Sequence, residues 1–437
     1  MTPKKSKRLL DRVLGAFTEV RKGEAATALL LMLNMFLLLA AYYLLKTIRE
    51  PLILNVPGGA EIKSYSSAAI AGLLIILVPA YSAVASRVSR VKLINGVTLF
   101  FIVCLLTFFG LSQAGVPIGV PFFIWVGIFS LMAVAQLWAF ANDVYTTEQG
   151  KRLFAVVGFG ASLGAIVGAF TTGQLVQVYG TGVFMIAAAV LLALCLLITN
   201  AVSIREADAR QTKAKEVVRG RSGFTLVFSD RYLLYIALLM LLVNLVNTTG
   251  EYILGKTVVG LYERQHGVAA GGIDEGKVIG EFYGNFFTMV NLLAVIIQAF
   301  VVSRVIKYFG VKVALLILPA VALIGYTGMA FLPFLSFIRT AKLAENSIDY
   351  SLQNTTKNAL YLPTSRQAKY KAKQANDAFF HRFGDVLSAG LVFAGTNWLG
   401  FGSRQFALVN VALVAGWLAL AVVLGRHFER LAKPKAA

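Results

Sequence analysis

The sequence predicts an all-α membrane protein with twelve transmembrane helices, arranged as two halves of six, with both termini in the cytoplasm. Three observations support this prediction. Of the 437 residues, 58% are hydrophobic and only 14% are charged, which is too apolar for a water-soluble chain of this length. A helix needs about 20 apolar residues to cross a bilayer, and such stretches recur along most of the chain. Finally, basic residues gather in alternate loops.

The apolar stretches give the expected helices in order: 25–48, 66–86, 93–112, 119–143, 154–177, 180–202, 231–255, 281–303, 312–332, 334–355, 383–399 and 404–425. The two tails and every second loop between these helices hold 32 of the 41 Lys and Arg residues. Positive loops remain in the cytoplasm. We therefore attribute the net charge of +20 to the basic loops that set the membrane topology. We expect the lipid bilayer, rather than nucleic acid, as the partner.

The stretch 334–355 is unusual because it is charged, yet the topology requires it to cross. The basic loop at 303–312 and the basic stretch from Arg366 to Lys373 both belong inside, and only 334–355 can return the chain there. On a helix, its polar side chains fall within an arc of roughly 140°. Charged groups in a bilayer are costly and mark a substrate or ion pathway. We therefore expect this helix to line a water-filled cavity.

A weak internal repeat supports the two halves. Ser86-Arg87-Val88 recurs as Ser303-Arg304-Val305, 217 positions later, and each is followed by a basic residue and Val-Lys. Two parallel repeats of six helices are typical of the major facilitator architecture. The expected organisation is a cytoplasmic basic tail at 1–24, a six-helix bundle at 25–202, a cytoplasmic basic linker at 203–230, a second bundle at 231–425 and a cytoplasmic tail at 426–437.

The candidate site residues lie mostly on the first helix of each group of three, and in this architecture those helices line the central cavity. Guanidinium and ammonium groups match phosphate oxygens, and aromatic rings offer a surface to a nucleotide base. The proposed substrate contacts on these helices are Lys46, Arg49, Arg339, Lys342, Tyr42, Tyr43, Trp138, Asn247 and Asn346. The proposed gating or proton-coupling acids are Glu50, Glu251, Glu345 and Asp349.

Structural roles for the same residues remain open at this point. Lys46 and Arg49 lie near the end of their helix, where long side chains can extend to the interface or pair with Glu251 as a gate. For Arg339, Lys342 and Glu345, the alternative to a functional role is a buried structural ion pair.

Several chemistries are not indicated. The sequence has no G-x-x-x-x-G-K-[ST] loop and no nucleophile–base set, so we expect neither ATP hydrolysis nor another enzyme activity. Two separate cysteines and three widely spaced histidines give no metal or cofactor site. The spacing of Gly158, Gly160, Gly164 and Gly168 in an apolar stretch is typical of close helix packing rather than of a nucleotide-binding loop. The apolar run after the N-terminal tail is too long for a signal peptide, so we expect an uncleaved first helix.

Motifs in both halves resemble the bacterial and plastid ATP:ADP antiporter family. They are Tyr42–Glu50, Leu137–Asn142, Glu148–Phe154, Gly158–Ala161, Asp349–Lys357, Leu360–Pro363 and Lys369–Lys373. The resemblance implies nucleotide exchange by alternating access, with Arg49 facing phosphate in the first half and Lys357 in the second. This chain departs from the family because no acid lies between Gly115 and Asn142, and because the family's acid in the seventh helix falls at Asn247.

We therefore expect a secondary active transporter of an anionic solute, in the first instance a nucleotide or related phosphorylated metabolite. We expect it to be a monomeric, multi-pass protein of the bacterial inner membrane without a cofactor. Two alternatives remain. One is a proton-coupled exporter of drugs, lipids or siderophore-like compounds, and the other is a non-transporting membrane receptor or assembly factor with the same fold.

Overall fold

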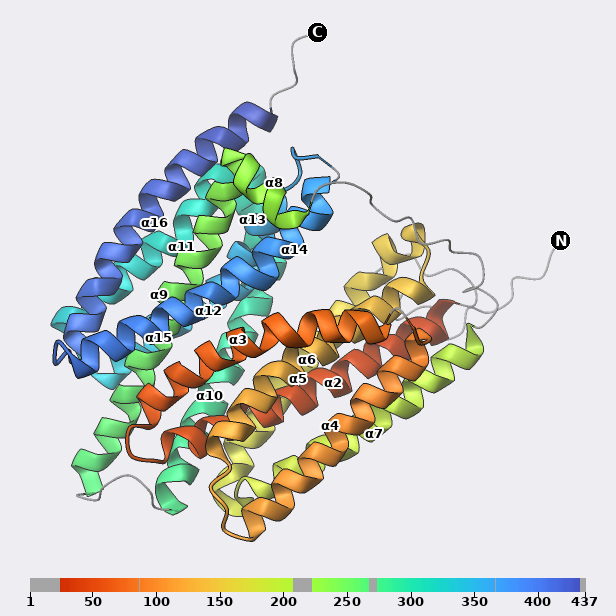
Figure 1. Cartoon of the computed structure of the whole chain (residues 1–437), viewed down its shortest axis with the longest axis horizontal. Coiled ribbons are helices and arrows are strands. Elements are labelled where there is room, and N and C mark those ends of the chain that lie inside the picture. Colours follow the sequence, from red (N-terminus) through yellow and green to blue (C-terminus); the bar gives the residue numbers. More distant parts are fainter. Residues whose placement is uncertain (1–23, 86, 207–221, 267–272, 366, 433–437) are drawn as a thin grey trace. The chain divides into compact units, whose positions relative to one another are not determined.

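The computed structural model describes residues 24–85, 87–206, 222–266, 273–365 and 367–432, and the regular structure within these ranges is helical (Figure 1). Most of the predicted tail 1–24, the linker residues 207–221, Arg366 and residues 433–437 lie outside the described part. The chain divides into two compact units. Unit 1 comprises Met1–Glu50, Val78–Lys215 and Gly280–Thr288; unit 2 comprises Pro51–Leu77, Glu216–Ile279 and Met289–Ala437.

Unit 1 is built from long helices joined by short connections. Its described elements are most of α2 (Glu24–Leu54), the end of α3 (Gly59–Ala85), α4 (Arg90–Gln113), α5 (Gly119–Val144), α6 (Thr147–Tyr179), α7 (Gly182–Arg205) and a middle part of α10 (Ile273–Ile297). Thr146 and Gln149 form a capping box that starts α6, so two otherwise unpaired backbone N–H groups are satisfied. Gly180, with φ 68°, ends the same helix.

Glycines on α6 allow α2 to approach closely. A Cβ atom on Gly160, Gly164 or Gly168 would collide with a backbone carbonyl oxygen of α2, whereas one on Gly158 would meet no atom within 4 Å. Small residues let helix backbones pack at short range in a membrane. The predicted packing role is thus confirmed for Gly160, Gly164 and Gly168, and it was wrong for Gly158, which faces away from α2.

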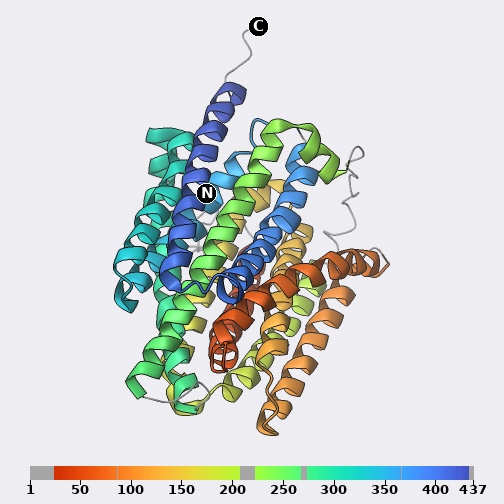
Figure 2. The ribbon, with the colours of Figure 1, turned by 60° about the vertical axis from the view of Figure 1, so that its left-hand side comes forward.

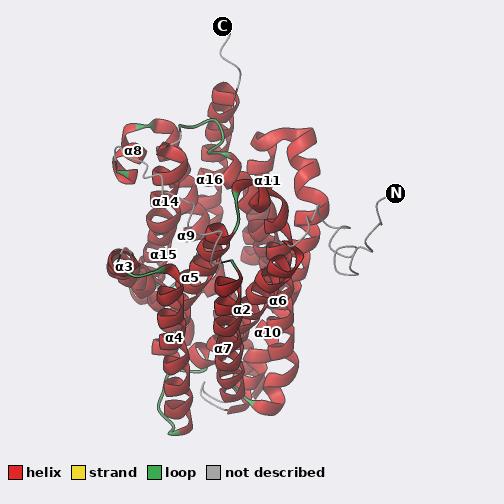
Figure 3. Cartoon of the chain, turned by 90° about the vertical axis from the view of Figure 1, so that its right-hand side faces the viewer, coloured by secondary structure: helices red, strands yellow, loops and turns green. Residues whose placement is uncertain are grey.

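Unit 2 contains the remaining helices, several of which have π-helical turns. They are α8 (Gly223–Ser229), α9 (Arg231–His266), η2 (Gln298–Val302), α11 (Ser303–Phe331), α12 (Leu335–Ile348), η3 (Asp349–Gln353), α13 (Asn354–Ala359), η4 (Ala368–Ala372), α14 (Lys373–Ala375), η5 (Asn376–Phe380), α15 (His381–Asn397) and α16 (Ser403–Ala432). The unit also includes the end of α2, most of α3 and both ends of α10. Within this unit α11 lies beside α16, and α9 packs against both α15 and α16 (Figure 2). Figure 3 shows how short the loops are.

Several predicted boundaries were wrong; for example, the helix expected at 231–255 continues to His266, and the helix expected to start at 281 starts at Ile273. The expected loop 303–312 is helical, and the backbone leaves helical geometry only at Gly310, where φ is 77° and a glycine is favoured. The helix expected to start at 66 starts at Gly59, seven residues earlier, because its polar first turns are packed against other helices. By contrast, the charged stretch expected at 334–355 is helical from Leu335 to Ala359, as predicted.

Within the described residues, nine helical segments are long and apolar enough to cross a membrane. One of them, Glu275–Phe331, has 57 residues and includes the break at Gly310. The charged run Leu335–Ala359 is not among the nine. The fold is therefore an all-helical membrane fold.

We predict that Gly164→Leu destabilises unit 1, because the new side chain would push α6 away from the backbone of α2. Overpacking of this kind costs about 1–3 kcal/mol. Thermal unfolding of the purified protein in detergent measures the effect. Gly158→Leu, on the same helix but facing open space, is the matched control. Equal loss of stability in both variants would contradict the packing argument.

Candidate functional site

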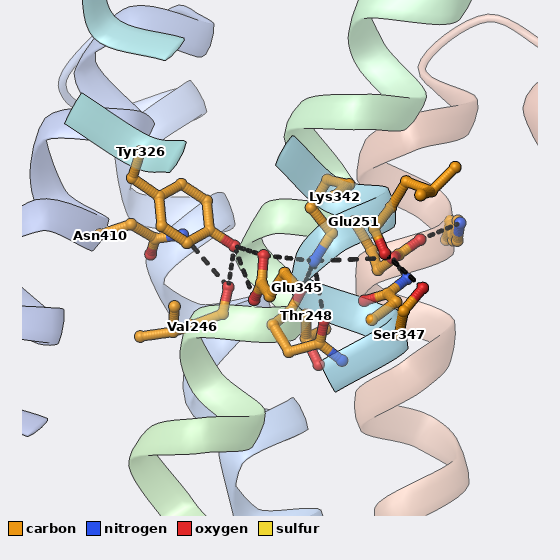
Figure 4. Close-up of polar contacts among 12 residues, drawn as sticks. Val246, Thr248, Glu251, Tyr326, Lys342, Glu345, Ser347 and Asn410 are labelled. Atoms are coloured by element: carbon orange, nitrogen blue, oxygen red, sulfur yellow. Dashed lines mark hydrogen bonds and ion pairs between the residues drawn. The ribbon is translucent and has the colours of Figure 1, made fainter. Parts of the chain in front are cut away.

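The polar stripe of α12 is centred on a fully buried lysine (Figure 4). The Lys342 side chain has no solvent exposure, and its Nζ lies 3.0 Å from Oε2 of Glu345. The same ammonium donates a 2.7 Å hydrogen bond to Oδ1 of Asn247 and lies 3.7 Å from Oε1 of Glu251, both on α9. Three partners from two helices therefore surround the charge.

Glu345 receives a second donor from α11. The hydroxyl of Tyr326 lies 2.9 Å from Oε2 of Glu345 and 3.1 Å from the carbonyl oxygen of Val246. Asn410 on α16 donates to the same carbonyl at 3.1 Å. A buried carboxylate is tolerated when its oxygens accept hydrogen bonds. These contacts hold Glu345 in place between α9, α11 and α12.

Glu251 extends the cluster to α3. Its Oε1 accepts a 2.9 Å hydrogen bond from Nδ2 of Asn346, and its Oε2 lies 4.0 Å from Nζ of Lys63. We call Lys63, Glu251, Lys342 and Glu345 the ion network. It contains two positive and two negative groups, so it is neutral when all four are ionised. Neutrality matters because an unpaired charge buried at this depth would cost several kcal/mol.

The first turns of α3 make a second contact with α9. Oε1 of Glu61 accepts hydrogen bonds of 2.8 Å from both the Tyr252 hydroxyl and Nζ of Lys256. Lys256 is also 2.9 Å from the Tyr252 hydroxyl, which closes a triangle of polar contacts. Together with Lys63, these groups tie the beginning of α3 to α9.

Unit 2 also contains a cavity of about 340 Å³ beyond the end of α12. Its lining combines apolar and polar side chains: Leu239, Met240, Val243, Asp349, Tyr350, Gln353, Asn354, Lys357 and His381. The π-helical turn η3 contributes Asp349 and Gln353 to this lining. Such turns widen a helix locally and are frequent at functional sites.

Lys357 and Asp349 are the charged groups of the cavity lining. Among the described residues, neither side chain has a hydrogen-bond or ion-pair partner within the 4.0 Å limit for an ion pair. The positive charge of Lys357 nevertheless acts on Asp349 through space. The cavity thus offers an ammonium group and a carboxyl group to a ligand, next to an apolar wall.

The candidate bases of unit 1 are held against aromatic rings. Nζ of Lys46 lies 4.2 Å from the ring centroid of Phe287 and 5.0 Å from that of Tyr43. The Arg49 guanidinium lies 4.5 Å from the ring centroid of Phe123. Its Nε is also 3.2 Å from Oε1 of Glu50. Cation–π contacts of this kind stabilise a cation that has left water.

The candidate aromatic residues of unit 1 lie in two different places. Tyr42 packs edge-on against Tyr43, with ring centroids 5.2 Å apart. Trp138 instead packs edge-on against Phe154, at 5.8 Å, near the start of α6. The remaining candidate, Arg339, is partly buried on α12. Within unit 2 the structure places candidates in the ion network and in the cavity, with Arg339 outside both; within unit 1 it places Lys46, Arg49, Tyr42 and Tyr43 in the aromatic contacts of α2 and Trp138 apart from them.

Sequence reasoning missed several polar residues. Glu61 and Lys63 precede residue 66, where the sequence predicts the helix to start, so the prediction places them in a loop. The serines that separate these two charges from the apolar run were the signal that the helix starts earlier. Asp385 was also missed. It is buried on α15 and accepts 2.8 Å hydrogen bonds from Asn244 and Thr248 of α9. A carboxyl group inside an otherwise apolar stretch was the signal there.

We predict strong coupling between Lys342 and Glu345. Removing one partner, as in Lys342→Met or Glu345→Gln, should lower the unfolding free energy by about 3–5 kcal/mol, because a buried charge loses its partner. The double variant should lose much less than the sum of the two. Thermal or denaturant unfolding in detergent gives the four values of the double-mutant cycle.

The exposed pair Lys312–Glu429, with Nζ and Oε2 3.1 Å apart, provides the control cycle. Its coupling should stay below about 1 kcal/mol, since solvent screens surface pairs. Additive losses at Lys342 and Glu345 would show that the two charges do not depend on each other.

Comparisons with known proteins agree with this fold. The "ADP,ATP carrier protein 1" of Chlamydia pneumoniae is 24% identical over 353 residues, which are 68% of this chain and 65% of that protein. The protein of the same name from Rickettsia conorii is 23% identical over 349 residues, 69% of this chain and 67% of that protein. The chain thus matches about two thirds of the length of these curated relatives. The resemblance to ATP:ADP antiporters is confirmed as a sequence similarity.

Solved structures share the fold at low identity. The crystal structure of a bacterial homologue of the iron transporter ferroportin, in an inward-facing state, has a TM-score of 0.66 and 12% identity, covering 92% of this chain and 98% of that one. The crystal structure of the nucleoside transporter NupG has a TM-score of 0.62 and 14% identity, covering 94% and 100%. Residues 25–341 match the family described as Major Facilitator Superfamily. This chain belongs to the Major Facilitator Superfamily.

Proposed function

We propose that the protein is a secondary transporter that exchanges a nucleotide, or a related phosphorylated metabolite, across a membrane by alternating access. The observation that carries the proposal is the cavity lined by Lys357, an ammonium group without an ion-pair partner among the described residues. The relatives named ADP,ATP carrier supply the substrate class. They are carriers, so the proposal requires no enzyme activity.

The cavity suits a ligand with an anionic group and a flat apolar part. The Lys357 ammonium matches phosphate oxygens. Met240, Val243 and Tyr350 provide apolar and aromatic surface for a base, and Gln353 can donate and accept hydrogen bonds. The volume of about 340 Å³ lies in the range of small-molecule sites.

The ion network is better suited to gating than to binding phosphate. The charge of Lys342 is already balanced by Glu345 and Glu251, so it offers little net attraction to an anion. The network instead joins α3, α9 and α12. We propose that Glu251 and Glu345 hold these helices in one arrangement and release them when the transporter changes state.

Asn247 stands where the ATP:ADP antiporter family has an acidic residue in the seventh helix, and its amide takes over a contact with Lys342. Its amide oxygen accepts the Lys342 hydrogen bond at 2.7 Å, at the place where a carboxylate would be expected. Glu345 supplies the negative charge from the neighbouring helix at 3.0 Å. We propose that this relocation preserves the gate while allowing a substrate other than ATP or ADP.

The unit 1 candidates remain proposed contacts for the anion. Lys46 and Arg49 lie against aromatic rings, and both are proposed to contact the anion. Glu50 would hold Arg49 when substrate is absent. Tyr42, Tyr43 and Trp138 are proposed to contact the base, and Asn346 and Arg339 the polar part of the substrate.

We propose twelve crossings with both termini in the cytoplasm. The long run Glu275–Phe331 divides at Gly310 into two crossings, and Leu335–Ala359 and α15 add two more to those that are apolar throughout. An even number places both termini on one side, and the basic loops place that side in the cytoplasm. A bacterial inner membrane, a monomeric state and six-helix bundles at 25–202 and 231–425 complete the proposal.

A proton-coupled exporter is the second candidate, and one observation favours it. Asp349 lines the cavity without a hydrogen-bond or ion-pair partner among the described residues, so it is available to bind and release a proton. Uptake by an exporter would respond to a pH gradient and to lipophilic cations, whereas exchange would respond to nucleotide on the opposite side.

We predict that liposomes containing the purified protein accumulate labelled nucleotide only when nucleotide or a related phosphorylated metabolite is present inside. Lys357→Gln should raise the half-saturating nucleotide concentration by about 10–100-fold, because a charge-assisted hydrogen bond is lost. Lys307→Gln, an exposed lysine on α11, is the control and should transport normally. Absence of any response across ATP, ADP, other nucleotides and sugar phosphates would refute the nucleotide proposal.

A further inference from the structure

A layer of short helical segments covers one end of unit 2. The helix α8 packs against η4 and α14, and Figure 1 shows α8, α13 and α14 at the same end of the unit. Gly223 makes this contact possible, since a Cβ atom there would collide with the carbonyl oxygen of Lys371. The helix α8 therefore packs closely against η4 and α14.

Aromatic rings form a continuous row on this layer. Phe228 packs against Phe380 at 5.9 Å, Phe224 against Phe379 at 5.2 Å, and Phe379 stacks on Phe383 at 5.9 Å with 9° between the rings. Phe224 and Phe228, one helical turn apart on α8, are 44% and 66% exposed. Aromatic side chains this exposed need a partner other than water.

The row continues onto the side of α15. Phe383, Val386 and Leu387 are each 38% exposed, so they extend the apolar surface along a helix that belongs to the membrane fold. Amphipathic helices that present phenylalanines lie at the boundary between the acyl chains and the headgroups, and we expect α8 to lie there.

The segment beside the row is basic. Residues 368–377 contain three lysines, Lys369, Lys371 and Lys373, and one acid, Asp377. Lys369 is exposed, and Lys373 forms a partly exposed 2.8 Å pair with Asp377. The local charge is therefore positive next to an exposed aromatic surface, the combination that attracts anionic lipid.

We propose that this surface binds an anionic phospholipid. The acyl chains would lie along Phe383 and Leu387, the phosphate would contact Lys369 and Lys373, and Phe224 and Phe228 would pack at the level of the glycerol. A soluble phosphate compound would leave the aromatic row uncovered, and a neutral phospholipid would leave the positive charge unbalanced. The proposal depends on the membrane fold and not on the identity of the substrate.

The test uses the full-length protein in mild detergent, with thermal unfolding as the measurement. Phosphatidylglycerol should raise the unfolding temperature by a few degrees more than phosphatidylcholine, because a ligand that binds only the folded state stabilises it. Glycerol phosphate, which has the charge without the chains, should give no such rise. Lys369→Gln combined with Lys373→Gln should abolish the difference between the two lipids.

Lys307→Gln combined with Lys312→Gln is the matched control, since it also removes one exposed lysine and one lysine of an exposed ion pair. This control should keep the difference between the lipids. An equal loss in the control would overturn the proposal in favour of general charge attraction. A rise with glycerol phosphate alone would overturn it in favour of a soluble anion.

Native mass spectrometry of the same variants counts bound lipid directly. The protein should retain phosphatidylglycerol in preference to phosphatidylcholine, and Phe224→Ser combined with Phe228→Ser should lower the retained amount severalfold. Retention that is unchanged in both the lysine and the phenylalanine variants would contradict the proposed surface.

Discussion

Unit 2 depends on the neutralisation of one lysine. Lys342 is fully buried on α12, where a lone ammonium would cost several kcal/mol. Glu345 on the same helix and Asn247 and Glu251 on α9 supply its partners. The neutrality of the cluster therefore requires α9 and α12 to keep one register, and Lys63 adds α3 to the same constraint. We propose that a change in the arrangement of these helices exchanges the partners of Lys342 together.

The same helical run carries a second set of charges in a different state. Beyond Ile348 the turn η3 leads from the closed ion network to a cavity, where Asp349 and Lys357 line the wall without a side-chain partner among the described residues. The charges of α12 are thus paired within the ion network, whereas Asp349 and Lys357 face a cavity that a ligand can enter. On the proposed function, this division separates the contacts that hold the helices together from those that bind the substrate, and we propose that the anion binds at Lys357 rather than at Lys342.

Features that depend on local sequence pattern, or on the distribution of Lys and Arg among the loops, could be predicted from the sequence. The helical run at Leu335–Ala359 was expected from the basic loops, and the contacts of Gly160, Gly164 and Gly168 on α6 followed from their spacing. Contacts between segments far apart in the chain were not accessible. Asn247 and Lys342 are 95 positions apart, and their contact depends on how α9 and α12 pack. Lys63 was missed because the residues around it are polar, so the apolar pattern predicts a later start for α3. The π-helical turn at Asp349 could not be predicted, because no local sequence pattern indicates it.

The central claim, that the anion binds in the cavity and not at the ion network, can be tested by thiol labelling. In a background without Cys104 and Cys195, Asn354→Cys places a thiol in the cavity wall and Ser347→Cys places one in the buried part of α12. A charged, membrane-impermeant thiol reagent is added to proteoliposomes with and without nucleotide. The account predicts that Asn354→Cys reacts and is protected by nucleotide, while Ser347→Cys stays unreactive. Nucleotide-protected labelling at position 347, without protection at 354, would contradict it.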